Sequence, residues 1–362
     1  MNKIPLVQKI ISKNTDVDTV AIIPGSNFKY LTGGNFHLME RPTVILITQN
    51  NSCFILPSLE KNSFEELNID AKVFYWQDKD GYQDAFQKAF SYLGDVKSIG
   101  VEGQNIRFIE LDAFQKVIPN IDIINYHKQL SSLRITKKQD EVDSLKKAIH
   151  LSEKALNDTI KFVSVGKTEL EIKNFLIKSL YDHGTHKIAF DPIVLASTHS
   201  ALPHGHPSDY KIQHNDALLF DFGGCVNGYN ADITRTFFVG AVNDTQRKIY
   251  DTVLEANRIG IEKCIKDNTL DLVDDSVLSF LEQSEFKEFI EHKTGHGLGL
   301  DIHEEPYVVR GNMQKLIPGM VVTIEPGLYD KKNCGVRIED DVLITESKAL
   351  SLTNFTKELT II

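Results

Sequence analysis

The chain has 362 residues, of which 41% are hydrophobic and 25% are charged, and its formal net charge is −10 at pH 7. This length and composition are typical of a globular protein with about two domains, each able to bury a core. The acidic balance disfavours nucleic acid and anionic membranes as partners. We find no run of about 20 apolar residues that could span a membrane, and no signal-peptide pattern at the N-terminus.

Four cysteines lie far apart in the sequence, namely Cys53, Cys225, Cys264 and Cys334. They form no CxxC pair and no spacing typical of a disulfide framework. Free thiols are normal in a reducing compartment. We therefore expect a cytoplasmic protein whose partner is neither a nucleic acid nor a membrane.

Short runs rich in β-branched residues alternate with short helical patterns in the first part of the chain. The strand-like runs are residues 17–24, 42–48, 52–57 and 97–103, and the helical patterns are residues 64–68 and 82–94. Such alternation is typical of an α/β layer. We predict an N-terminal α/β domain over residues 1–127, with no metal-like cluster.

A highly charged segment follows, in which apolar residues recur on one helix face. These residues are Leu133, Val142, Leu145, Ile149, Leu156 and Ile160. The pattern predicts a linker and then the first long helix of a second domain, residues 128–362, with Thr136 as its N-cap. A second helix is predicted next, with a capping box of Thr168 and Glu171 and an end at Gly184.

Strand patterns dominate the rest of the chain. They cover residues 188–197, 216–224, 232–240, 320–329 and 335–345, and helical patterns return at 245–265 and 272–290. We therefore predict a mixed α+β second domain. The halves before and after Gly240 have similar patterns, which would fit a distant internal duplication.

Two aspartates flank a turn-rich segment of this domain. Asn227-Gly228 is a strong signal for a two-residue hairpin turn. With that turn, Asp221 pairs opposite Thr234, and Asp232 is its neighbour on the same face. Both carboxylates would then reach one metal site, although aspartates near turns also bond backbone amides.

Two glutamates and their neighbours carry a second acidic pattern. Glu325 ends the strand pattern VVTIE before a Pro-Gly turn, and Glu339 shares a strand face with Arg337 and Asp341. An acidic residue on an otherwise apolar strand is costly to bury unpaired, although an edge carboxylate can also face solvent.

His296 lies in the segment HKTGHGLGLDIHEEP, among Gly295, Gly297 and Gly299. These glycines argue against a helix. They favour a strand or loop that another backbone approaches closely. A lone histidine is more often structural, but three histidines in twelve residues favour a functional segment.

Taken together, five residues form a far more specific pattern than any one of them: Asp221, Asp232, His296, Glu325 and Glu339. Four carboxylates and one imidazole suit a pair of divalent ions better than a thiol-seeking ion. Two of the carboxylates must bridge the ions, which leaves room for a bridging water. The set predicts a two-metal centre, for which manganese, cobalt, zinc and iron all fit.

These motifs resemble the pita-bread metallopeptidases, specifically the Xaa-Pro dipeptidase (prolidase) and aminopeptidase P branch. The C-terminal part carries, in that family's order, FDPIVLASTHSALPHGHPSD, DFGGCVNGYNADITRTFFVG, HKTGHGLGLDIHEEP, IPGMVVTIEPGLY and CGVRIEDDVLIT, and the N-terminal part carries NFKYLTGG and ERP. The resemblance implies a small creatinase-like α/β domain followed by a pita-bread domain with a curved antiparallel sheet covered by helices. Gly34 departs from the pattern, since an aromatic residue is usual there.

The resemblance also implies roles for individual residues. Asp221 would bind one metal ion, Asp232 and Glu339 would bridge, and His296 and Glu325 would complete the second, with Glu325 also the general base on the bridging water. The other implied catalytic residues are His204 for substrate binding, His303 for the oxyanion, His292 for the proline-side pocket and Arg337 for holding carboxylates in place.

Some further implications concern assembly and the wider network. The family pattern implies two divalent ions per subunit, with manganese favoured, and a homodimer. In such a dimer His37 is a candidate to reach the partner subunit's active site. Tyr229 is a candidate either for packing or for the network around Asp232.

The implied activity is hydrolysis of the Xaa-Pro bond, in dipeptides first, by attack of a metal-bridging hydroxide. Aminopeptidase P, which releases the first residue of longer Xaa-Pro peptides, stays an alternative because the motifs barely separate the two. Methionine aminopeptidase fits less well because it does not need the first domain. A relative with another small-molecule substrate and a non-catalytic peptide-binding module also stay open, although such modules usually lose ligands.

Overall fold

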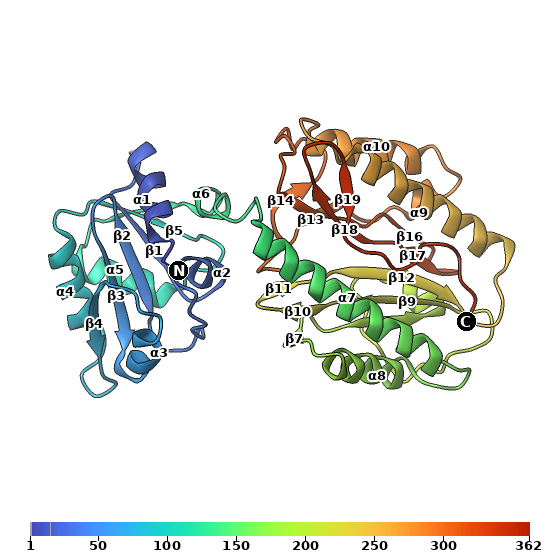
Figure 1. Ribbon diagram of the computed structural model, residues 1–362, viewed down its shortest axis with the longest axis horizontal. Coiled ribbons are helices and arrows are strands. Elements are labelled where there is room, and N and C mark those ends of the chain that lie inside the picture. The colour runs from blue at the N-terminus through green and yellow to red at the C-terminus, as the bar shows by residue number, and fades with distance from the viewer. Residues whose placement is uncertain (1, 15) are drawn as a thin grey trace. The chain divides into compact units, whose positions relative to one another are not determined.

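The structure, a computed structural model, describes residues 2–14 and 16–362. The chain divides into two compact units, Met1–Arg134 and Ile135–Ile362. Each unit combines helices with its own strands (Figure 1), so the predicted α/β and α+β fold class is confirmed. Helix α6 (His127–Ser131) occupies the segment between the sequence-based boundary at residue 127 and this division.

The first unit contains one six-stranded mixed sheet with helices around it. Its strands are β1 (Thr19–Ile22), β2 (Val44–Thr48), β3 (Ser52–Pro57), β4 (Lys72–Trp76), β5 (Ser98–Val101) and β6 (Asp122–Asn125). The strand order is β4-β3-β2-β1-β5-β6, with antiparallel pairs at β1-β2 and β2-β3 and parallel pairs elsewhere. The predicted apolar runs thus become strands that are buried on both faces.

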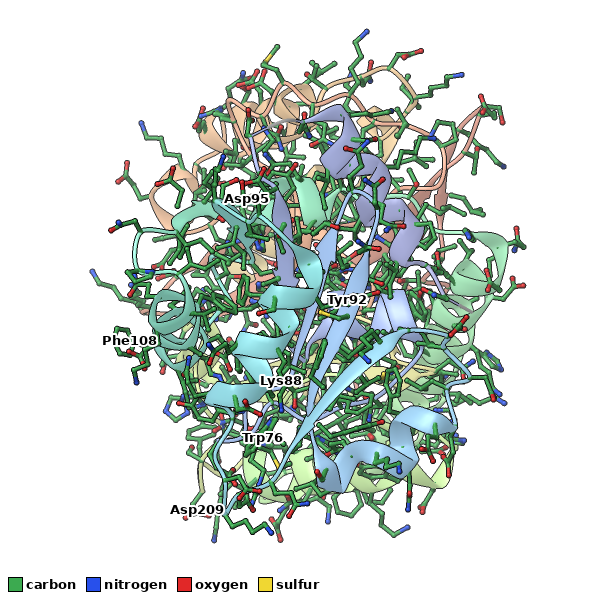
Figure 2. All side chains as sticks on the ribbon, turned by 90° about the vertical axis from the view of Figure 1, so that its left-hand side faces the viewer. Trp76, Lys88, Tyr92, Asp95, Phe108 and Asp209 are labelled. Carbon is green, nitrogen blue, oxygen red and sulfur yellow. The ribbon has the colours of Figure 1, made fainter. Side chains whose placement is uncertain are left out.

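The helices of the first unit are α1 (Ile4–Lys13), α2 (Ser26–Thr32), α3 (Lys61–Glu65), α4 (Gln83–Leu93) and α5 (Phe108–Val117), with a 3₁₀ turn η1 (Ser58–Glu60). Helix α4 illustrates why they pack on the sheet. Its residues Phe86 and Phe90 are buried in the core, whereas Lys88 and Tyr92, both labelled in Figure 2, are largely exposed. The spacing of the apolar residues therefore gives the helix one buried face.

Four long helices belong to the second unit: α7 (Gln139–Phe162), α8 (Glu169–Asp182), α9 (Asp244–Lys263) and α10 (Leu270–Glu282). The predicted apolar face of α7 is buried at Val142, Leu145, Ile149 and Leu156, whereas Ile160 is only partly buried and Leu133 lies before the helix. The predicted capping box of α8 is confirmed by reciprocal hydrogen bonds of 3.1 and 2.7 Å between Thr168 and Glu171. Among the described residues, none of the helices is both long enough and apolar enough to cross a membrane.

The predicted N-cap of α7 is wrong. The helix begins at Gln139, and Glu141 accepts a hydrogen bond from the backbone N–H of Lys138 at 2.8 Å. Thr136 instead forms a β-bridge with Met320. The extended pairing holds the backbone away from helical geometry for two more residues, so the helix starts later than the capping pattern predicts.

The strands of the second unit lie between the α7–α8 pair and the α9–α10 pair (Figure 1). They are β7 (Lys187–Ile188), β8 (Ile193–Ala196), β9 (Ala217–Phe222), β10 (Gly224–Val226), β11 (Tyr229–Asn230), β12 (Ile233–Phe238), β13 (Gly295–Gly297), β14 (Glu304–Val308), β15 (Val321–Ile324), β16 (Gly327–Tyr329), β17 (Gly335–Arg337), β18 (Asp340–Ile344) and β19 (Ala349–Ser351), with 3₁₀ turns η2 (Ser197–Ala201) and η3 (Lys287–Phe289). The sheets have the orders β11-β10-β7, β12-β9-β8, β14-β13-β15-β18-β19 and β16-β17. Every strand pair within these sheets is antiparallel.

The two halves of this unit repeat one order of elements. A helix pair, α7 and α8, precedes strands β7 to β12, and a second pair, α9 and α10, precedes strands β13 to β18. The second helix of each pair begins after a threonine N-cap, Thr168 or Thr269, whose side chain accepts a backbone N–H. The similarity of patterns about Gly240 therefore corresponds to a similarity of structure.

Glycines on β13 let two backbones come close together. A Cβ atom at Gly295 would lie 2.0 Å from the carbonyl oxygen of Thr323, and one at Gly297 would lie 2.6 Å from that of Glu305. The predicted close approach of another backbone is confirmed. It allows His296, between these glycines, to reach a buried position on the strand.

This packing generates a first prediction. Gly295→Ala should lower the free energy of unfolding by about 1–3 kcal/mol, because the strand pair must move apart to accept a methyl group. Thermal unfolding measures the stability change, and metal analysis should show weaker retention of ions by the displaced His296. Gly25→Ala is the matched control, since its Cβ would meet nothing closer than 3.9 Å; equal behaviour of the two variants would contradict the prediction.

Candidate metal centre

A hairpin positions the first two acidic residues. Asn227 and Gly228 both have positive φ, 54° and 92°, as the predicted two-residue turn requires. The register pairs Asp221 of β9 with Thr234 of β12, so that prediction is confirmed. Asp232 immediately precedes β12 and lies on the same face of the hairpin, where both carboxylates line one pocket.

The second half of the unit supplies the remaining side chains. Glu325 follows β15, and Glu339 precedes β18 and accepts a hydrogen bond from the Thr234 hydroxyl at 2.7 Å. His296 Nε2 lies 3.3 Å from Glu325 Oε1 and 3.7 Å from Asp232 Oδ2. Its Nδ1 lies 3.1 Å from the carbonyl oxygen of Gly297, a contact that favours the tautomer with a free lone pair on Nε2.

The structure brings all five sequence-predicted ligands into overlapping groups. Asp221, Asp232 and Glu339 offer oxygens within 4.8 Å of one another, and His296, Glu325 and Glu339 do the same. Glu339 belongs to both groups, as a bridging ligand would. A third group joins Asp232 and His296 to His303, whose ring centroid lies 3.9 Å from that of His296.

Burial and mutual repulsion dominate the electrostatics of these carboxylates. Burial, with the charges of Glu339 and Asp221, raises the pKa of Asp232 well above its usual range. Burial, with the charges of Glu325 and Asp221, likewise raises the pKa of Glu339. Burial and the nearby Asp221 raise the pKa of Glu325 to about 7, even though Arg337 opposes the shift. Burial lowers the pKa of His296 to about 3, so that its imidazole is neutral.

Two observations test whether these residues fit divalent ions. The Oδ1 atom of Asp221 is buried and has no hydrogen-bond donor among the described residues, although Oδ2 accepts one from Arg337. Four clustered carboxylates have a single guanidinium, that of Arg337, in the same pocket lining. A pair of divalent cations requires several oxygen ligands whose negative charge is not already balanced, and it accepts a neutral imidazole as a further ligand. The five side chains therefore fit a pair of divalent ions.

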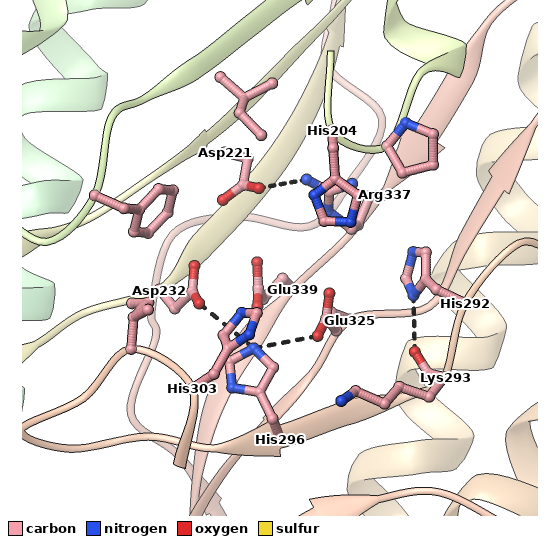
Figure 3. A pocket seen from close by; sticks show the side chains of 14 residues that line it. His204, Asp221, Asp232, His292, Lys293, His296, His303, Glu325, Arg337 and Glu339 are labelled. Atoms are coloured by element: carbon pink, nitrogen blue, oxygen red, sulfur yellow. Dashed lines mark hydrogen bonds and ion pairs between the residues drawn. The ribbon is translucent and has the colours of Figure 1, made fainter. Parts of the chain in front are cut away.

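The remaining sequence-predicted residues surround this centre in one pocket of about 400 Å³ (Figure 3). Arg337 donates to Asp221, to the Tyr329 hydroxyl at 2.8 Å and to Thr234 Oγ1 at 3.1 Å. His204, His292 and His303 also line the pocket. Figure 3 shows His303 beside His296, with the ring centroids 3.9 Å apart.

Sequence reasoning missed two residues at this site, one in the hydrogen-bond network and one in the pocket lining. The Tyr329 hydroxyl contacts His292 Nε2 at 2.6 Å as well as Arg337, so it joins these two side chains. Tyr329 could have been found from the sequence because it is the last residue of the motif IPGMVVTIEPGLY. Lys293 also lines the pocket, and its signal was its place in HKTGHG. Tyr229, which we considered for the network, packs against the hydrophobic core.

Comparisons with known proteins agree with this geometry. Residues 143–346 match metallopeptidase family M24, and residues 4–136 match the creatinase/prolidase N-terminal domain. The chain belongs to metallopeptidase family M24. The resemblance noted from the motifs is thereby confirmed, and the predicted class, a hydrolase acting as a metallopeptidase, follows from it. Membership of this metallopeptidase family implies divalent metal ions, for which the five clustered side chains are candidate ligands.

Individual relatives of this M24 metallopeptidase cover nearly its whole length. The Xaa-Pro dipeptidase of Pyrococcus horikoshii is 33% identical over 358 residues, which are 99% of this chain and 98% of the relative. The structure of the Xaa-Pro dipeptidase from Bacillus anthracis superimposes with a TM-score of 0.91 at 29% identity, covering both chains fully. The structure of the X-Pro aminopeptidase from Thermotoga maritima superimposes with a TM-score of 0.87 at 28% identity, again covering both chains fully.

The raised pKa values generate a second prediction for the M24 metallopeptidase. Metal ligation requires the ionised carboxylates, so metal loading near pH 7 should release protons, and the release should diminish as the pH is raised above 7. Titration calorimetry in buffers of low and high ionisation enthalpy measures the number of protons released. Glu325→Gln should release fewer protons than the wild type. Binding heats that do not depend on the buffer would contradict this expectation.

Proposed function

We propose that the chain is a dinuclear-metal-dependent Xaa-Pro dipeptidase. The observation that carries the proposal is the convergence of Asp221, Asp232, His296, Glu325 and Glu339 in one small pocket. A volume of about 400 Å³ is near the lower end of the ~300–1,000 Å³ typical of small-ligand sites, which suits a dipeptide. Similarity to proteins named Xaa-Pro dipeptidase over the whole chain supports the same activity.

The proposal assigns two divalent ions to this site, with manganese favoured. Asp221 would hold one ion, His296 and Glu325 the other, and Asp232 and Glu339 would bridge them. When bound, the ions supply Lewis acidity, which lowers the pKa of a water molecule toward about 7 and polarises the substrate carbonyl. Glu339 lies close to Asp221 and Asp232 as well as to His296 and Glu325, which supports a bridging role.

Glu325 is the proposed proton carrier. Its carboxyl lines the pocket together with His296 and Glu339, so it is placed to exchange a proton with a water molecule there. It would take a proton from the attacking water and deliver it to the proline nitrogen of the leaving group. The Xaa-Pro amide has no N–H, so this nitrogen must receive a proton from the enzyme as the bond breaks.

The histidines and Arg337 have supporting roles in the proposal. His303, beside His296, would donate a hydrogen bond to the carbonyl oxygen as negative charge develops there. Arg337 would hold Asp221 through its direct contact, and His204 and His292 would contact the substrate. Apolar lining residues, among them Phe190, Ile193 and Pro203, provide a surface for the proline ring.

Aminopeptidase P activity is the second candidate. The structural similarity to the Thermotoga maritima X-Pro aminopeptidase, with a TM-score of 0.87, is the observation that favours it. Both activities need the same metal centre and the same proline pocket. They differ in whether the space beyond the proline accepts more peptide.

The proposal extends to assembly and compartment. We propose a homodimer in the cytoplasm, whose partners are proline-containing peptides. Four buried cysteines without disulfides among the described residues support a reducing compartment. His37 lies on an exposed segment with Leu38 and Met39, so it is accessible to a partner subunit. Light scattering coupled to gel filtration measures the subunit number.

A substrate panel tests the proposed function. Xaa-Pro dipeptides should be hydrolysed with a kcat/KM at least tenfold above that for Xaa-Pro-Yaa tripeptides, and only with Mn, Co, Zn or Fe restored after chelation. Xaa-Ala dipeptides are the control for the proline requirement. A preference for tripeptides would favour aminopeptidase P, and a metal-loaded protein that hydrolyses neither class would contradict the proposal.

The proton-carrier role has its own prediction. Glu325→Gln keeps an oxygen ligand but cannot carry a proton, so turnover should fall by at least about 1,000-fold while most of the metal is retained. Elemental analysis and dipeptide kinetics measure the two quantities on the same sample. Substantial activity in the metal-replete variant would rule out the role that we assign to Glu325.

A further inference from the structure

The two glutamates of the candidate metal centre lie where the chain passes from one sheet to another. Glu325 lies in the gap between β15 and β16, and Glu339 lies in the gap between β17 and β18. The pairing of β15 with β18 ends at Ile324 and Asp340, and the pairing of β16 with β17 begins on the other side of the two glutamates. Regular strand pairing is therefore interrupted at both glutamates, and the backbone groups beside them need other partners.

One buried side chain of helix α9, that of Asn257, donates to the backbone beside both glutamates. Its Nδ2 donates to the carbonyl oxygen of Ile324 at 2.9 Å and to that of Ile338 at 3.2 Å. These two residues directly precede Glu325 and Glu339 in the chain. A primary amide has two N–H donors, and the side chain of Asn257 is fully buried. A single group therefore joins the two peptide units from which the glutamates extend.

The amide of Asn257 is itself held in one orientation. Its Oδ1 accepts a hydrogen bond from Lys357 Nζ at 2.8 Å, and the same ammonium donates to Asp340 Oδ2 at 2.6 Å. An ammonium can only donate, so the amide oxygen must face Lys357 and the NH₂ group must face the two carbonyl oxygens. Asp340, the residue after Glu339, also accepts from Arg235 at 2.7 Å. The amide is thus one member of a connected polar network behind the glutamates.

A glycine of the same helix lets the short asparagine side chain reach the strands. Gly260 follows Asn257 by three residues, so both lie on one face of α9. A Cβ atom at Gly260 would lie 2.7 Å from Ile324 Cγ2, closer than a side chain can come. Helix α9 therefore lies closer to β15 than an alanine would permit. This close packing brings the amide within hydrogen-bond distance of both carbonyl oxygens.

We propose that Asn257 is a positioning residue, which sets the separation of Glu325 and Glu339 and thereby the affinity of the site for divalent ions. This role rests on the proposed dinuclear function. The two carboxylates repel each other, and this repulsion acts to move their segments apart while the site holds no cation. The two hydrogen bonds of Asn257 oppose that movement because they tie both segments to one helix. Asn257 acts through the backbone of the ligands, so the role needs no contact with the substrate.

Titration of the metal-free full chain with Mn²⁺ tests this role. Asn257→Leu removes both donors at similar volume, and the dissociation constant for Mn²⁺ should rise by roughly 10–100-fold, as is typical when a ligand loses its supporting hydrogen bond. Asn257→Asp keeps the shape and the contact with Lys357 but has no N–H to donate, so it should show the same loss. Tyr250→Phe is the matched control, because this buried tyrosine of α9 donates to the carbonyl oxygen of Lys357 at 3.0 Å. Its dissociation constant should stay within about threefold of the wild type.

A spectroscopic measurement separates the position of the ligands from general stability. At saturating Co²⁺, the visible absorption of the Asn257 variants should differ from that of the wild type, because the placement of the ligands determines the geometry at the ion. Tyr250→Phe should keep the wild-type spectrum even if its unfolding temperature falls equally. A folded Asn257 variant with wild-type Mn²⁺ affinity and Co²⁺ spectrum, or an equal loss of affinity in Tyr250→Phe, would overturn the role. A wild type that binds neither Mn²⁺ nor Co²⁺ would instead defeat the proposed dinuclear function and this role with it.

Discussion

The repulsion among four clustered carboxylates is the constraint on which the rest of the second unit depends. Asp221, Asp232, Glu325 and Glu339 share one pocket with a single guanidinium. Burying like charges together is strongly unfavourable unless cations and hydrogen bonds compensate. The fold compensates in part through Arg337 and Thr234. The negative charge that remains uncompensated suits the divalent ions that membership of family M24 implies.

The compensating groups form a connected network. Arg337 links Asp221 to Tyr329, and Tyr329 in turn links Arg337 to His292. Hydrogen bonds that connect several buried side chains restrict the arrangements open to each of them. The network therefore fixes side chains of four separate segments in the pocket wall. Lys293 differs from its neighbours because its charge is balanced only at a distance and by an aromatic ring.

Features of the site could be predicted from the sequence where they depend on residues close together in the chain. The pairing of Asp221 with Thr234 was predictable because turn chemistry and the period of two residues act within one hairpin. The contact of Glu339 with that hairpin could not be predicted from the sequence. Thr234 and Glu339 are 105 residues apart, and their hydrogen bond depends on how the sheets pack. The ligand set was recognisable as chemistry, but its geometry followed only from the family resemblance.

The errors have the same origin. Thr136 has the right residue type for a helix cap, yet the N–H of Lys137 donates to the carbonyl oxygen of Gly319 at 2.7 Å and Thr136 pairs with Met320. The Nζ of Lys137 also forms a buried ion pair with Glu304 at 2.8 Å. These distant partners outweigh a capping preference worth about 1 kcal/mol. Tyr329 was missed because an aromatic residue after a turn predicts packing as readily as chemistry.

The repeated order of elements has a consequence for how the centre comes into being. The half that contains α7 and α8 supplies Asp221 and Asp232, and the half that contains α9 and α10 supplies Glu325 and Glu339. Neither half alone has enough ligands for two ions. During synthesis the first pair of carboxylates therefore emerges before the second, and the full set of candidate ligands is assembled only when the second half has folded. Divalent ions held by these ligands would stabilise the contact between the halves, because they would bind the assembled state and not its separate parts.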